Sequence, residues 1–152
     1  GGGYVRNQLR IHPNGKLGFE QYWPAGGPTV TYEAIKPFEK GKWYFVGISH
    51  KADWKLKTGK YTVGGKWILY VNGEEIGHCD KPEKPFDNAW NTGEKTAIGA
   101  KINGNSDKAN KPGSPKEGSS LNGAIDDLRL YNRALSESEI LVLYDLEKPK
   151  GK

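Results

Sequence analysis

The spacing of turn signals constrains this chain more than any other feature of its sequence. Short apolar runs alternate with glycine-containing turns, and two of the four Asn-Gly pairs in the sequence, Asn14-Gly15 and Asn72-Gly73, stand between such runs. Asn-Gly accepts the positive φ angles of tight hairpin turns. Residues 9–23 therefore predict a hairpin about Pro13-Asn14-Gly15, and "WILYV" (67–71) predicts a second hairpin with "EEIG" (74–77).

Composition agrees with an all-β fold in one domain. The 152 residues are 11% aromatic, with five Trp and eight Tyr, and 21 glycines add to a hydrophobic share of 35%. Such a chain can bury one core but not two. "KWYFVGISH" (42–50) is apolar on both faces and predicts a central strand. Trp43 and Trp67 lie inside predicted strands and are expected in the core. "TAIG" (96–99) predicts another short strand.

Two polar segments interrupt the predicted strands. Residues 51–65, "KADWKLKTGKYTVGG", are too many for a minimal hairpin and predict a long loop that carries Trp54 and Tyr61. Residues 100–120 are rich in Gly, Asn, Lys, Pro and Ser, and they predict a flexible polar loop. Long loops in compact domains often carry function.

Charge and cysteine content narrow the function classes. The net charge of +5 comes from lysines spread along the whole chain, a pattern typical of a solvated surface and not of a nucleic-acid site. A single cysteine, Cys79, rules out an internal disulfide and a cysteine-based zinc site. No apolar segment is long enough to span a membrane, and no signal peptide is present; if the protein is exported, its signal is expected upstream of Gly1.

Two adjacent carboxylates stand in an otherwise apolar run, "AIDDLRLY" (124–131). Strand alternation places Asp126 on the face of Leu128 and Leu130, whereas Asp127 shares the other face with Arg129. A carboxylate among leucines must be metal-bound, paired with a cation or hydrogen-bonded to backbone amides, because uncompensated burial is costly. Calcium and a buried hydrogen bond both remain open for Asp126, and Asp127 is expected nearer to solvent.

A short helix is predicted at 136–145. Ser136 followed by Glu139 is the capping-box pattern. The apolar residues of this segment form a stripe that would pack on the sheets: Ile140, Leu141, Leu143 and Tyr144.

Taken in order, "GKWYFVGIS", "WILYVNGEEIG" and "LNGAIDDLRLYNRALSESEILVLY" resemble the laminin G-like, concanavalin A-like jelly-roll domains of bacteria and archaea, from about Leu9 to Tyr144. The resemblance implies an all-β, two-sheet antiparallel β-sandwich over residues 1–152 with one short C-terminal helix. It also implies an extracellular or cell-surface location, a role in glycan binding or adhesion, and a calcium site at or near Asp126, with Asp127 as a candidate further ligand. Nothing before Tyr4 matches the opening strands of the family, so the domain is expected to be truncated at its N-terminus, and loop 51–65 is longer than usual.

Three functions compete. Catalysis is disfavoured, because adjacent strand residues such as Asp126 and Asp127 cannot flank one glycosidic bond, and His12, His50 and His78 lack the spacing of a triad or metal cage. A structural subunit, completed by strands of a partner chain or by self-association, would use open sheet edges. We favour a non-catalytic module that binds polysaccharide or another glycan. Its candidate stacking residues lie in or next to predicted loops, although each would more commonly pack in the core: Trp23, Trp54, Tyr61 and Trp90.

Overall fold

The computed structural model describes residues 6–22, 30–33, 36–57, 60–85, 98–100 and 119–148. The contacts divide the chain into two compact units. Unit 1 comprises Gly1–Trp90 with Tyr131–Lys152, and unit 2 comprises Asn91–Leu130. We describe each unit by itself.

The first sheet of unit 1 holds β1 (Arg6–Ile11), β2 (Leu17–Tyr22) and β3 (Val30–Glu33), which are antiparallel and lie in that order. The predicted hairpin between β1 and β2 is confirmed, with Ile11 opposite Leu17. At its turn Gly15 has a φ of 79°. The Asn14 side chain accepts a hydrogen bond of 3.0 Å from the Lys16 backbone N–H. The asparagine and the glycine therefore each have the role that their position predicts.

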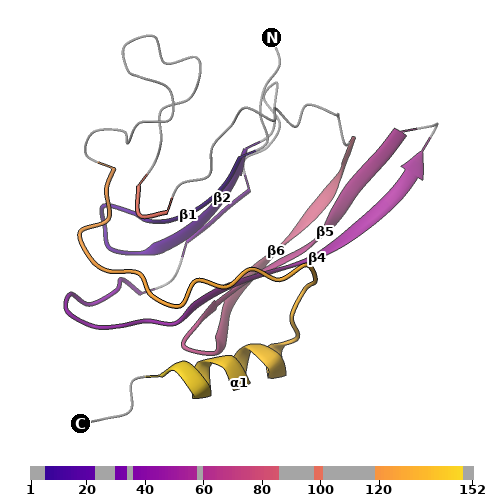
Figure 1. Ribbon diagram of the computed structural model, residues 1–152. Coiled ribbons are helices and arrows are strands. Elements are labelled where there is room, and N and C mark those ends of the chain that lie inside the picture. Colours follow the sequence, from indigo (N-terminus) through magenta and orange to yellow (C-terminus); the bar gives the residue numbers. More distant parts are fainter. Residues whose placement is uncertain are drawn as a thin grey trace. The chain divides into compact units, whose positions relative to one another are not determined.

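The second sheet holds β4 (Val46–Lys57), β5 (Lys60–Val71) and β6 (Glu74–Pro85), again antiparallel and in chain order (Figure 1). Asn72 and Gly73 join β5 to β6 with φ angles of 53° and 83°. Positive φ at both central positions is what a tight hairpin turn of the primed type requires. The second predicted hairpin is therefore confirmed.

The predicted loop at 51–65 is wrong. β4 and β5 pair without interruption from Val46 opposite Val71 to Lys57 opposite Lys60. Polar and apolar residues alternate through "KADWKLK", and this period of two extends the strand past the expected end. Gly65, which we assigned to the loop, instead adopts a φ of 114° at an irregularity in the pairing of β5 with β6. A glycine inside a strand commonly marks such a bulge.

The core of unit 1 lies between its two sheets. Leu17 of β2 and Leu69 of β5 are each only 3% exposed, and five partly buried residues pack against them: Phe38, Val46, Ile48, Val71 and Ile76. Phe19 of β2 stacks on Trp67 of β5 with ring centroids 4.7 Å apart, so Trp67 packs between the sheets as predicted. The protein is thus mostly β, with two antiparallel sheets and one short C-terminal helix, as the sequence predicted.

Helix α1 (Glu137–Glu147) packs on the second sheet. Ile140 is buried, and the ring of Tyr144 meets the ring of Phe45 edge-on at 6.0 Å. A side-chain carbon at Gly73 would lie 2.9 Å from Cδ1 of Tyr144, so the turn glycine also allows the helix to approach closely. Ser49 of β4 donates to the Leu135 carbonyl at 3.0 Å, which fixes the chain just before the helix.

The predicted capping box is confirmed. The Ser136 side chain accepts from the Glu139 N–H, and the Glu139 carboxylate accepts from the Ser136 N–H at 2.9 Å. Arg133 adds a two-pronged contact that the sequence pattern did not reveal, since its two terminal nitrogens donate to the two Glu139 oxygens at 2.6 and 2.8 Å. The hydrogen bonds from Arg133 and, to a smaller extent, from Ser136 lower the pKa of Glu139 from 4.5 to about 2.

A pH dependence follows from the Glu139 contacts. Because the pKa of Glu139 is lower in the folded chain than the ordinary 4.5, its contribution to stability is complete above pH 4.5 and is lost as pH falls toward 2. The carboxylate is exposed, so solvent screening keeps the contribution small. We measure the free energy of unfolding by urea denaturation at a series of pH values. Between pH 4.5 and 2 we expect it to fall less steeply with decreasing pH in Glu139→Gln than in the native chain. An unchanged pH dependence would contradict this role, and Asp145→Asn on the same helix is the control.

Unit 2 contradicts the prediction of a final strand at 124–131. Residues 119–130 form no regular strand, and their apolar side chains are exposed, with Leu128 at 59% and Leu130 at 91%. The Asp126 side chain accepts from the Asp127 N–H at 2.9 Å, and Asp127 has a φ of 50°. A side chain that bonds locally to the backbone competes with strand pairing. Residues 98 and 99 of the predicted strand 96–99 are bends, while residues 96–97 and most of loop 100–120 lie outside the described residues.

Candidate functional site

Of the two tryptophans whose side chains the structure describes, Trp43 and Trp67, Trp43 lies at the surface. Its side chain was predicted to be in the core, yet the residue is 58% exposed. The prediction failed because β4 begins only at Val46, so Trp43 lies before the strand and strand alternation does not apply to it. A largely exposed tryptophan is unusual, since burying its large apolar surface normally stabilises a fold.

Residues 36–45, which we call the Trp43 loop, are closed by a pair of stacked rings. Phe38 and Tyr44 lie parallel, with an interplanar angle of 3° and centroids 4.1 Å apart. The Tyr44 hydroxyl also accepts from the Glu39 backbone N–H at 3.0 Å. The side chain next to Trp43 therefore holds both sides of the loop together.

Hydrogen bonds to both hairpin turns hold the Trp43 loop in place. Phe38 N–H donates to the Gly15 carbonyl at 2.9 Å, in the turn between β1 and β2. Phe45 N–H donates to Oδ1 of Asn72 at 3.1 Å, and Asn72 N–H donates to the Phe45 carbonyl at 2.9 Å. A loop fixed in this way loses little conformational entropy on binding, which favours affinity.

Charged residues belong to the same loop as the exposed indole. Lys42 and Glu39 form an ion pair of 2.7 Å, and this hydrogen bond raises the pKa of Lys42. Lys36 and Lys40 are exposed, and a side-chain carbon at Gly41 would meet nothing within 4 Å, so this turn projects into open space. An indole face packs on the C–H side of a sugar ring, while ammonium and carboxylate groups bond to its hydroxyls. The Trp43 loop therefore contains the kinds of side chain that contact sugars.

The four predicted stacking residues are not part of the Trp43 loop sequence, and none has a described side chain. Trp54 and Tyr61 are on β4 and β5, where the register sets Trp54 opposite Val63 and Tyr61 opposite Leu56, and the described structure there is that of the backbone. Trp23 and Trp90 lie outside the described residues. Their part in binding stays a prediction. A sequence signal for Trp43 existed in "KPFEKGKW", where Pro37 and Lys40-Gly41 favour turns directly before the tryptophan.

Asp126 and Asp127 are both exposed, which contradicts the predicted burial of Asp126. The Asp127 backbone N–H donates to the Asp126 carboxylate. Calcium takes six to eight oxygen ligands, whereas the described residues contain no group of three or more acids, histidines or cysteines able to hold a metal. The two aspartates by themselves do not fit a complete calcium site, and calcium binding stays a prediction.

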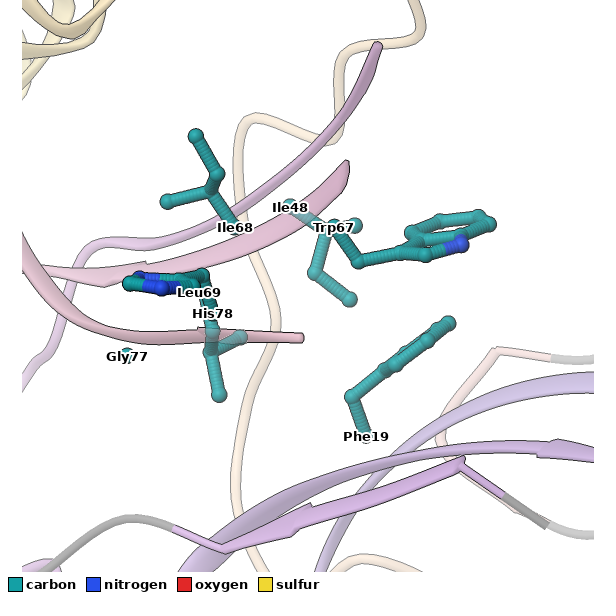
Figure 2. A pocket seen from close by; sticks show the side chains of 7 residues that line it. All are labelled: Phe19, Ile48, Trp67, Ile68, Leu69, Gly77 and His78. Atoms are coloured by element: carbon teal, nitrogen blue, oxygen red, sulfur yellow. The ribbon is translucent and has the colours of Figure 1, made fainter. Parts of the chain in front are cut away.

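A small hollow lies beside the core (Figure 2). Phe19 points from β2 toward Trp67, and the other walls are mostly apolar residues of the second sheet: Ile48, Ile68, Leu69, Gly77 and His78. A ligand site needs several polar groups that converge on it, whereas these lining residues offer only the His78 ring and the indole N–H of Trp67 as polar side-chain groups. We interpret the hollow as a gap in packing between the sheets.

The three histidines have separate structural settings. His50 is opposite Trp67 in the β4–β5 register, and its ring stacks on the indole at 3.8 Å. Nδ1 of His78 lies 2.6 Å from the Glu75 carboxylate. A side-chain carbon at Gly18 would overlap the ring of His12, so that ring covers the glycine. These settings explain the histidines as packing and pairing residues.

Comparisons with known proteins identify a family. A laminin G model, described as "Concanavalin A-like lectin/glucanases superfamily", matches residues 1–141. The crystal structure of residues 221–444 of an S-layer domain-containing protein from Clostridium thermocellum is similar, with 26% identity and a TM-score of 0.49. That similarity covers 91% of this chain and 55% of the solved chain, so this chain spans about half of the other. No curated protein matches, and none of the described helices is long and apolar enough to cross a membrane.

Proposed function

Because the chain belongs to the concanavalin A-like lectin and glucanase superfamily, we propose that it is a non-catalytic module that binds carbohydrate outside the cell or on its surface. The observation that carries the proposal is Trp43, 58% exposed on a loop closed by the Phe38–Tyr44 stack. Rigid aromatic side chains give large contact area at a small entropic cost. Binding through such a module would serve attachment to a polysaccharide or adhesion to a surface.

Superfamily membership alone does not separate binding from catalysis, since the family description names lectins and glucanases together. Glycoside hydrolysis requires two carboxyl groups on opposite sides of one bond. Near Trp43, the loop 36–45 contains a single acid, Glu39, and that acid is paired with Lys42 at 2.7 Å. This composition supports binding as the function of the loop.

Polysaccharide depletion tests the proposal directly. The protein is incubated with insoluble polysaccharides of different backbones and with a soluble glycan array, and the bound fraction is measured. We expect saturable binding to at least one glycan, with no release of reducing sugar over a long incubation. Release of reducing sugar would overturn the non-catalytic assignment, and a complete lack of binding across chemically diverse glycans would overturn the proposed function.

A structural role is the second candidate, and the exposed apolar side chains of unit 2 favour it. Ile125, Leu128 and Leu130 are all exposed there, and apolar residues gathered in one segment commonly mark an interaction site. Native mass spectrometry distinguishes the roles. A monomer supports the binding module, whereas oligomers or a tightly held second polypeptide support a subunit completed by a partner chain.

Calcium enters the proposal as a stabiliser of the segment that holds Asp126 and Asp127. If Asp126 is a ligand, Asp126→Asn should lower the melting temperature by several degrees in calcium and leave it unchanged in chelator, because a ligand stabilises only the state that binds it. Differential scanning calorimetry under both conditions measures this, with the exposed Asp145→Asn as the control. An equal loss with and without chelator would show that Asp126 does not act through calcium.

A further inference from the structure

We propose that the glycan bound at the Trp43 loop is anionic, carrying carboxylate or sulfate groups, and that Lys36 and Lys40 select it. This inference rests on the proposed function, because it names the ligand class of the same site. It follows from three properties of residues 36–45: their charge, the ion pair that they already contain, and the way in which the loop is closed.

The loop has an excess of positive charge that it does not neutralise internally. Residues 36–45, "KPFEKGKWYF", hold three lysines and one acid. The acid, Glu39, is engaged with Lys42 at 2.7 Å. Lys36 and Lys40 therefore remain as two positive charges beyond what the loop's own carboxylate can balance. A neutral sugar gains nothing from this excess, whereas an anionic sugar does.

The closure of the loop keeps these charges near the indole. Phe38 stacks on Tyr44, the neighbour of Trp43, at 4.1 Å, and Lys36 stands two residues before Phe38. Lys40 stands three residues before Trp43, and a chain of three residues spans at most about 11 Å. Long, flexible lysine side chains at these positions can reach groups on a sugar that rests on the indole. The two cations and the aromatic face thus act on one ligand.

A second basic surface on the β4–β5 hairpin gives a matched control. Lys51 and Lys66 are directly opposite each other in the strand register, so two like charges share one face. They belong to the middle of the hairpin, and Lys51 stands eight residues after Trp43. Replacing them changes the net charge by the same amount as replacing Lys36 and Lys40, but on paired strands and not in the Trp43 loop.

The test uses one polysaccharide backbone with and without charge. Polygalacturonate and its fully methyl-esterified form are titrated into the native chain, Lys36→Gln/Lys40→Gln and Lys51→Gln/Lys66→Gln at low salt, with calorimetry as the readout. The loop double variant leaves the Glu39–Lys42 ion pair in place. We expect native protein to prefer the charged polymer, the loop variant to lose about tenfold in affinity for it, and high salt to remove most of that difference. Sulfated and unsulfated dextran are the second pair.

Three outcomes would overturn the inference. Equal affinity for charged and neutral polymers in both pairs would show that charge does not select the ligand, while binding that still depends on Trp43 would leave the proposed function standing. An equal loss in both double variants would show a general effect of net charge. Equal binding of an inorganic polyphosphate, or of a single-stranded DNA of matched charge, would show that the loop recognises a polyanion and not a glycan.

Discussion

Trp43→Ala is expected to weaken glycan binding about tenfold or more while leaving the fold intact. A tryptophan that anchors a ligand commonly contributes 2 kcal/mol or more when it is truncated. The residue is 58% exposed, so its removal opens no cavity, and substitutions at such positions usually change stability by less than about 0.5 kcal/mol. Isothermal titration with the glycan found by screening measures the first effect, and urea denaturation measures the second.

Trp43→Phe is the matched control for this prediction. Phenylalanine retains an aromatic face but loses area and the indole N–H, so we expect an affinity between those of the native chain and the alanine variant. Full affinity in Trp43→Ala would contradict the site. A large loss of folding stability in the same variant would show instead that Trp43 belongs to the core, as strand alternation had predicted.

Gly65→Ala is expected to destabilise the protein by about 2–4 kcal/mol, the largest effect on stability among the substitutions considered. Gly65 has a φ of 114°, a backbone conformation that side chains disfavour. A side-chain carbon there would also overlap the Lys51 carbonyl oxygen and lie 3.0 Å from the Asp53 backbone nitrogen. Because these atoms belong to the backbone of β4, the clash can be relieved only by separating the paired strands.

Comparison with Gly41→Ala separates the steric clash at Gly65 from the backbone strain, because Gly41→Ala introduces the strain alone. Gly41 also has a positive φ, 75°, but a side-chain carbon there would meet nothing within 4 Å. We therefore expect Gly41→Ala to cost only about 1 kcal/mol, from backbone strain. Urea denaturation of both variants gives the comparison. Equal losses would show that the close approach of β4 to Gly65 does not matter for stability.

Features set by neighbouring residues were predictable from the sequence. The two hairpin turns depend on Asn14-Gly15 and Asn72-Gly73, and the helix start depends on Ser136 with Glu139. In each case the residues that form the bonds lie within four positions of one another, so a local pattern contains the physical cause. The structure confirms these predictions.

Features set by distant partners were not predictable in this way. β4 begins at Val46 because its partner β5 ends at Val71, where the Asn72-Gly73 turn starts. Trp43 therefore has no partner residue in β5, although the sequence from residue 42 onward predicts one continuous strand. The exposure of Trp43 thus depends on a turn far along the chain, and the sequence pattern near Trp43 does not contain this information.

The prediction of a strand at 124–131 was wrong for a related reason. Its alternation suits a strand, but a strand needs a partner for its backbone groups, and within unit 2 the Asp126 side chain bonds to the Asp127 N–H instead. Alternation describes which faces a strand would have and does not say whether the strand forms. The burial predicted for Asp126 depended on the formation of this strand.

The central claim is that Trp43 contacts the glycan, and NMR of the tryptophan indole N–H groups tests it most directly. The chain has five tryptophans, so a tryptophan-labelled sample gives one indole signal for each, and Trp43→Phe identifies the signal of Trp43 by its disappearance. We predict that adding the glycan shifts the Trp43 signal most, with Trp67 nearly unchanged between the sheets. An unmoved Trp43 signal, with the shift on Trp23, Trp54 or Trp90, would contradict the account and return the site to the residues first predicted.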